Sequence, residues 1–96
     1  MSKQVLVIHG GAGTIRTQDM TAEMESAYLK GLEEALLAGY SLLEKGSSAV
    51  DAVLAATKSL EDNILFNAGR GSVFAADGAQ EMDASIMDGS TLKAGA

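Results

Sequence analysis

The chain has 96 residues, of which 47% are hydrophobic and 21% are charged, as in soluble globular proteins. Thirteen acidic against seven basic residues give a net charge of −6 with only 4% aromatic residues, which disfavours binding to nucleic acid or to an anionic membrane surface. The absence of cysteine excludes disulfides and thiolate metal sites.

The first apolar segment is Val5–Ile8, a short, continuous and mostly β-branched run. Such a run predicts a strand that is buried on both faces of a sheet. It is shorter than the roughly 7–15 apolar residues of a secretion signal or the about 18 of a membrane span, so we expect a cytoplasmic protein. The glycine-rich sequence at 9–13 then predicts a turn with close backbone approach.

Two helices are predicted next. Apolar residues at steps of three and four indicate an amphipathic helix over residues 21–45, and Gly46 stands at the position of a helix C′ glycine. Ser48 and Asp51 form a start signal similar to a capping box, for a second helix that ends near Leu60. The expected core positions are Met24, Ala27, Tyr28, Leu32, Ala35, Leu36, Leu42 and Leu43 in the first helix, and Val50, Val53, Leu54, Thr57 and Leu60 in the second.

The last third of the sequence predicts a loop followed by three strands. Residues 61–71 lack periodicity, whereas 72–75, 80–87 and a segment from Thr91 onward have strand character. The turn dipeptides between these strands are Asp77-Gly78 and Asp88-Gly89. Because two helices and a meander on one side cannot cover both faces of the first strand, we expect residues 1–96 to form an incomplete α+β unit.

Few residues can carry chemistry. The loop at 9–13 could present backbone N–H groups to an anion or oxyanion, or it could simply make a tight turn with His9 hydrogen-bonded in the core. No P-loop, dinucleotide fingerprint or nucleophile elbow is present. Asp83 and Asp88 could be paired carboxylates, although their strand and turn context favours a solvated face and a turn. The loop at 61–71 must satisfy many carbonyl groups, either through internal turns or through a hard cation.

Four segments together resemble one known family. They are Val5–Gly13, Ser48–Val53, Leu65–Val73 and Glu81–Gly89, the last continuing into residues 92–96. In this order and spacing they are similar to the N-terminal half of the α-subunit of isoaspartyl peptidases and plant-type (type III) L-asparaginases, which are Ntn-hydrolases. The resemblance covers essentially the whole chain.

The resemblance implies a four-layer αββα sandwich made as an inactive precursor. The precursor would cut itself before a threonine beyond residue 96, and that threonine would be the nucleophile with its own α-amine as base. We therefore expect the coding sequence to continue to a Gly-Thr junction; Gly13-Thr14 mimics such a junction, but it lies inside the glycine loop. The products would be L-aspartate and either ammonia or the remainder of a β-aspartyl peptide. Its partners would be its own β-subunit and a second αβ unit in a homodimer.

The resemblance also implies roles for individual residues. Asn67 would lie beside the nucleophile, and Gly10 would belong to a mobile loop that takes part in self-cleavage. No organic cofactor is expected. A sodium ion would be held by the main-chain carbonyls of Leu60, Glu61, Asn63, Phe66, Ala68 and Arg70, with the Arg70 side chain pointing away from the ion.

Two other functions compete with this one. His9-Gly10-Gly11 could be the oxyanion loop of an α/β-hydrolase esterase, although two helices follow where strand and helix should alternate. The chain could instead be a small non-catalytic module whose glycine loop binds an anion.

Overall fold

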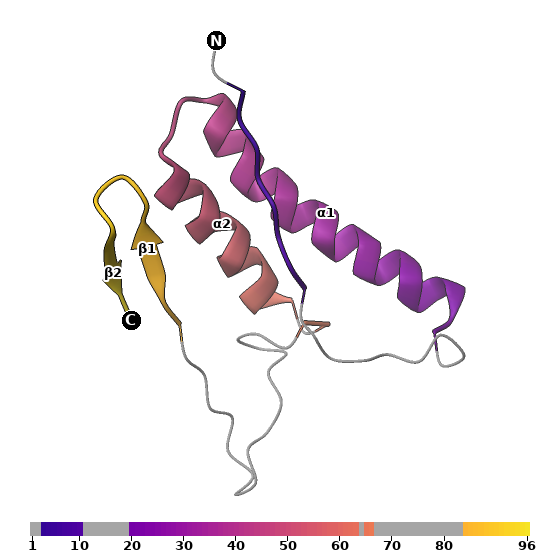
Figure 1. The fold of residues 1–96 in the computed structure, drawn as a ribbon. Helices are drawn as coiled ribbons and strands as arrows, with labels where there is room; N and C mark the ends of the chain where they lie inside the picture. Colours follow the sequence, from indigo (N-terminus) through magenta and orange to yellow (C-terminus); the bar gives the residue numbers. More distant parts are fainter. Residues whose placement is uncertain (1–2, 11–19, 64, 67–83) are drawn as a thin grey trace, which may run out of the picture.

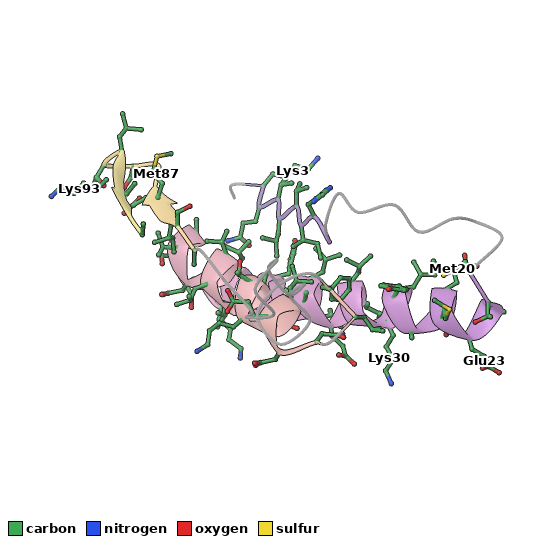
Figure 2. The ribbon with its side chains drawn as sticks, turned by 90° about the horizontal axis from the view of Figure 1, so that it is seen from below. Lys3, Met20, Glu23, Lys30, Met87 and Lys93 are labelled. Carbon is green, nitrogen blue, oxygen red and sulfur yellow. The ribbon has the colours of Figure 1, made fainter. Side chains whose placement is uncertain are left out.

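The computed structural model describes residues 3–10, 20–63, 65–66 and 84–96. Its elements are α1 (Ala22–Glu44), α2 (Ala49–Asp62), β1 (Ile86–Asp88) and β2 (Lys93–Gly95). The helices pack side by side, residues 3–10 run across them, and the β1–β2 hairpin lies next to α2 (Figure 1). Figure 2 shows the extended segment and the hairpin on the same side of the helix pair, while Lys30 and Glu23 project from the other side.

Both helices begin at a side-chain cap, and the sequence predicts the one at Ser48. The Thr21 hydroxyl accepts a hydrogen bond from Met24 N at 3.0 Å, and the Ser48 hydroxyl accepts one from Asp51 N at 3.2 Å. Each bond satisfies one of the amide groups left without a partner in a first helical turn. The predicted glycine stop is also confirmed, since Gly46 has φ +86°.

The second helix is longer than predicted. It continues through Asp62, two residues past the predicted end near Leu60, so residues 61 and 62 belong to the helix and the predicted start of the loop at residue 61 is wrong. No glycine or proline stands between Leu60 and Asn63, and Asn63 N closes the last turn by donating to Leu60 O at 3.2 Å. The cation ligands expected at Leu60 and Glu61 therefore belong to the last turn of a helix.

The two helices meet through small residues. The buried positions are Gly31, Ala35 and Gly39 in α1, and Ala52 and Ala56 in α2. Each set is spaced by four residues and so lies along one face of its helix. Side chains this small let the two backbones approach closely.

The large apolar residues expected to form the core are less covered than the sequence predicts. Ala35 is buried as predicted, but Met24 and Leu36 keep 38% and 36% of their surface exposed, and Val53 and Leu54 keep 40% and 48%. Hydrophobicity does not predict the buried positions here, because the contact between the two helices is made by small residues. The large apolar side chains lie on the neighbouring faces of the helices, where they stay partly exposed.

The N-terminal segment is extended, but it does not have two covered faces. Leu6 and Ile8 are half-buried, whereas Val5 and Val7 are 70% and 83% exposed. In the described part of the chain, no strand pairs with this segment and the two helices cover one of its sides. The predicted burial on both faces is therefore wrong for the chain as it folds here.

The C-terminal strands form an antiparallel hairpin in which Ile86 pairs with Gly95 and Asp88 with Lys93. The predicted turn at Asp88-Gly89 is confirmed, but the following strand begins at Lys93 instead of Thr91. Thr91 N and Leu92 N both donate to Asp88 O, which holds these two residues in the turn.

Of the strand predicted at 80–87, the described part is a strand only from Ile86. The strand at 72–75 and the turn at 77–78 lie outside the described residues. None of the helices in the described part of the chain has the length and apolar character needed to span a membrane.

We expect Gly39→Ala to destabilise the protein. A methyl group at this position would stand 2.7 Å from the carbonyl oxygen of Ala52 and 2.7 Å from Leu6 Cδ2. Overpacking of this kind costs about 1–3 kcal/mol, more than the ~1 kcal/mol that alanine contributes over glycine in a helix. Denaturant unfolding should show a net loss. Ser26→Ala, at an exposed position of α1, is the control and should cause none; a stabilising Gly39→Ala would contradict the close contact.

Candidate active site

Two segments far apart in the sequence meet beside α1. Gly10 is the last described residue of the extended segment, and the turn after α2 brings Phe66 against it. A methyl group on Gly10 would stand 3.1 Å from Phe66 Cε1 and 3.3 Å from Leu32 Cδ2, so the Gly10 backbone lies close to the aromatic ring. Phe66 is only 4% exposed. The glycine loop therefore starts from a position fixed by an aromatic side chain.

Helix α1 supplies the wall behind the Phe66 ring. The rings of Tyr28 and Phe66 meet edge to face, with centroids 5.9 Å apart and planes at 75°. One turn further along α1, a methyl group on Gly31 would stand 2.9 Å from Phe66 Cε2. Phe66 is thus enclosed by the Gly10 backbone and by α1.

Asn63 shapes the turn that carries Phe66. Its Oδ1 accepts a hydrogen bond from Leu65 N at 3.0 Å, and its main-chain carbonyl accepts one from Phe66 N at 3.3 Å. Its Nδ2 lies so close to α1 that a methyl group on Gly31 would stand 2.6 Å away. The sequence analysis missed this role of the side chain, although an asparagine directly after a helix is a known signal for such a turn.

The structure describes four of the six residues expected to bind sodium, and all four lie at or just after the C-terminal end of α2. Leu60 O and Asn63 O each accept one hydrogen bond, from Asn63 N and Phe66 N, and a carbonyl oxygen has a second lone pair. The last turn of α2 contains Glu61 and Asp62 and no basic residue. The remaining two positions, Ala68 and Arg70, lie outside the described residues.

The other predicted site residues are placed only in part. Asn67, Thr14 and Asp83 lie outside the described residues, although Asn67 directly follows the anchored Phe66 in the sequence. Asp88 holds the hairpin turn, since its Oδ1 accepts bonds from Ser90 Oγ at 2.8 Å and Ser90 N at 3.0 Å. These two hydrogen bonds lower the pKa of the Asp88 carboxyl, and they support a turn role over a paired carboxylate.

The structure thus brings together one residue of each expected functional loop, Gly10 and Phe66. Comparisons with known proteins show the family to which the chain belongs. A family model described as asparaginase matches residues 2–96. The chain belongs to the asparaginase family.

Individual relatives agree with the family model. An isoaspartyl peptidase of Salmonella typhimurium is 50% identical over 96 residues, which are 100% of this chain and 31% of the relative. A plant-type L-asparaginase of Pyrococcus abyssi is 55% identical over 91 residues, 95% of this chain and 28% of the relative. An isoaspartyl peptidase of Escherichia coli is 48% identical over 96 residues, 100% of this chain and 30% of the relative. The chain thus spans about 30% of the length of these curated relatives, and the predicted family is confirmed.

We expect Asn63→Ala to loosen the turn that carries Phe66. The change leaves Leu65 N without its acceptor in a half-buried position, which typically costs about 1–3 kcal/mol. Thermal unfolding should show this loss, and Asn63→Asp, which keeps an acceptor oxygen, should lose less. Lys58→Ala, at an exposed position of α2, is the control. If Asn63→Ala stayed within about 0.5 kcal/mol of the parent, as neutral surface changes do, the turn would not depend on this side chain.

Proposed function

We propose that this chain is the N-terminal portion of the α-subunit of a longer hydrolase that releases L-aspartate from β-aspartyl peptides and from L-asparagine. The observation that carries the proposal is the identity of about half of all residues, over nearly the whole chain, with relatives named isoaspartyl peptidase and plant-type L-asparaginase. The family match gives no support to an esterase or to an anion-binding module.

In this proposal the chain supplies supporting groups and no nucleophile. The nucleophile is a threonine beyond residue 96, exposed by self-cleavage of the precursor and activated by its own α-amine. The Asn67 amide, both donor and acceptor, orients the threonine hydroxyl. The backbone at Gly10 supports self-cleavage. The contact between Gly10 and Phe66 favours this division of roles, because it joins the glycine loop to the residue that precedes Asn67.

The proposed fold of the whole protein is the αββα sandwich. The extended segment and the hairpin share one side of the helix pair, as expected for an outer helix layer that covers a sheet (Figure 2). Val5 and Val7 point large apolar surface away from the helices, where a second layer would cover it. In the proposed assembly the chain pairs with its own β-subunit, and two αβ units form a homodimer in the cytoplasm.

We also propose a sodium ion held by main-chain carbonyls at 60–70. The residues present fit such an ion. The last carbonyls of a helix lack intrahelical partners, and they form the negative end of the helix dipole. Glu61 adds negative charge, and the last turn of α2 contains no basic residue. The ion would neutralise converging carbonyl oxygens and so stiffen the segment that leads to Asn67.

We expect the longer protein to mature into an active enzyme and residues 1–96 alone to be inactive. Positioning groups without a nucleophile cannot form the covalent intermediate. Aspartate release from β-aspartyl-leucine should be measured for both proteins after purification. Turnover by residues 1–96 would place the nucleophile within this chain, with Thr14 as the first candidate, whereas a mature longer protein without turnover would refute the proposed activity.

We expect Asn67→Ala to slow the mature enzyme. Loss of one positioned hydrogen-bonding group typically lowers the rate by ~10²–10³-fold. The measurement is kcat per folded molecule, and Asn67→Gln, which retains an amide, is the control for folding of the loop. If Asn67 only stabilises its loop, Asn67→Ala will unfold more easily while its folded fraction keeps a kcat within about threefold of the parent, well below the loss expected for a positioning group.

A further inference from the structure

We propose that the side chain of Phe66 is a positioning residue for Gly10, and that it sets the geometry of the glycine loop during self-cleavage. This inference rests on the proposed function and goes beyond it, because there Phe66 contributes only its main-chain carbonyl, as a sodium ligand. The ring, held by α1 on one side, fixes the Gly10 backbone on the other.

The ring lies close to Gly10. Two ring atoms, Cε1 and Cδ1, would stand 3.1 and 3.3 Å from a methyl group on Gly10. A residue with a side chain at this position would displace the ring by a few tenths of an ångström, whereas glycine does not. The position of the Gly10 backbone is therefore sensitive to the position of the Phe66 ring.

The ring is itself held in place. Tyr28 meets it edge to face, and a methyl group on Gly31 would stand 2.9 and 3.2 Å from its Cε2 and Cζ atoms. A phenyl side chain has only two rotatable bonds and is 4% exposed here, so it transmits the position of α1 to Gly10 with little freedom.

The main chain adds a second connection. Phe66 N donates to Asn63 O at 3.3 Å, which ties the residue to the end of α2. A shift of the ring therefore acts on the turn after α2 and on the Gly10 backbone together. A residue that merely filled a gap in the core would stabilise the protein without such a coupling.

A double-mutant cycle in the longer precursor tests the coupling. Gly10→Ala, Phe66→Leu and the double variant are compared by their rates of self-cleavage and by kcat and KM after maturation. We expect each single variant to slow self-cleavage, by up to about 10²-fold for a displacement near 1 Å, with KM little changed. Leucine leaves space for the methyl group that Gly10→Ala introduces, so the double variant should be faster than the product of the two effects by at least about twofold.

Two further variants separate positioning from stability. Tyr28→Leu removes the edge contact while leaving Phe66 in place, so it should slow self-cleavage even if Phe66→Leu fails to fold. Thr21→Ala removes the N-terminal cap of α1, away from Gly10 and Phe66, so it should lower Tm and leave the self-cleavage rate of folded protein unchanged.

The Gly10 α-protons provide a readout that does not depend on activity. An aromatic ring in contact with them shifts their NMR resonances, and Phe66→Leu should abolish that shift. Multiplicative effects of the two single variants, or Gly10 resonances unmoved by Phe66→Leu, would overturn the positioning role while leaving the proposed function intact. A parent precursor that neither cleaves itself nor releases aspartate would instead refute the proposed function.

Discussion

The close packing of α1 on α2 is the contact on which the other features of this chain depend. The buried residues of α1 are Gly31, Ala35 and Gly39, and Gly39 lies close to Ala52 and Ala56 of α2; none of these residues has a side chain larger than a methyl group. Because the helices approach this closely, their ends are fixed relative to each other. The turn after α2 consequently falls beside the middle of α1, and that turn carries the residues of the candidate site.

Gly31 links the helix packing to the site. It belongs to the small-residue face of α1, and it also lies close to Asn63 Nδ2 and to the Phe66 ring. A larger residue there would push the turn away from α1 and would release Phe66 from Gly10. One glycine thus serves both the packing of the helices and the position of the site, and this explains why the turn after α2 stays close to α1.

The sequence predicts the local features well and the packing less well. The cap at Ser48 and the glycine stop at Gly46 depend on residues a few positions away, so the sequence pattern is sufficient to predict them. The buried face of α2 depends on which surface is presented to α1. Hydrophobicity alone predicts that Val53 and Leu54 are buried, whereas close approach of the helices requires Ala52 and Ala56 at the contact. In the structure Ala52 and Ala56 are the buried residues.

The candidate site shows the same division. The sequence points to Gly10 and Asn67 because they belong to motifs that resemble a family. The residues that lie close to Gly10 are Phe66 and Leu32, and Phe66 is in turn held by Tyr28, Gly31 and Asn63. Glycine has no side chain to signal a contact, and an edge-to-face ring pair between residues 28 and 66 leaves no periodic pattern in the sequence. The roles of these residues can be identified only from the three-dimensional arrangement of the helices.

The exposed faces of the chain follow from the same packing. With the small residues of α2 turned to α1, Val53 and Leu54 line a groove of about 580 Å³ together with Ile86 and Met87 of the hairpin. Val5 and Val7 are exposed on the extended segment, which lies on the same side of the helices (Figure 2). Because small residues join the helices, large apolar side chains such as Val53 and Leu54 remain exposed and can pack against a neighbouring layer. This arrangement is expected of an outer helix layer in the proposed sandwich.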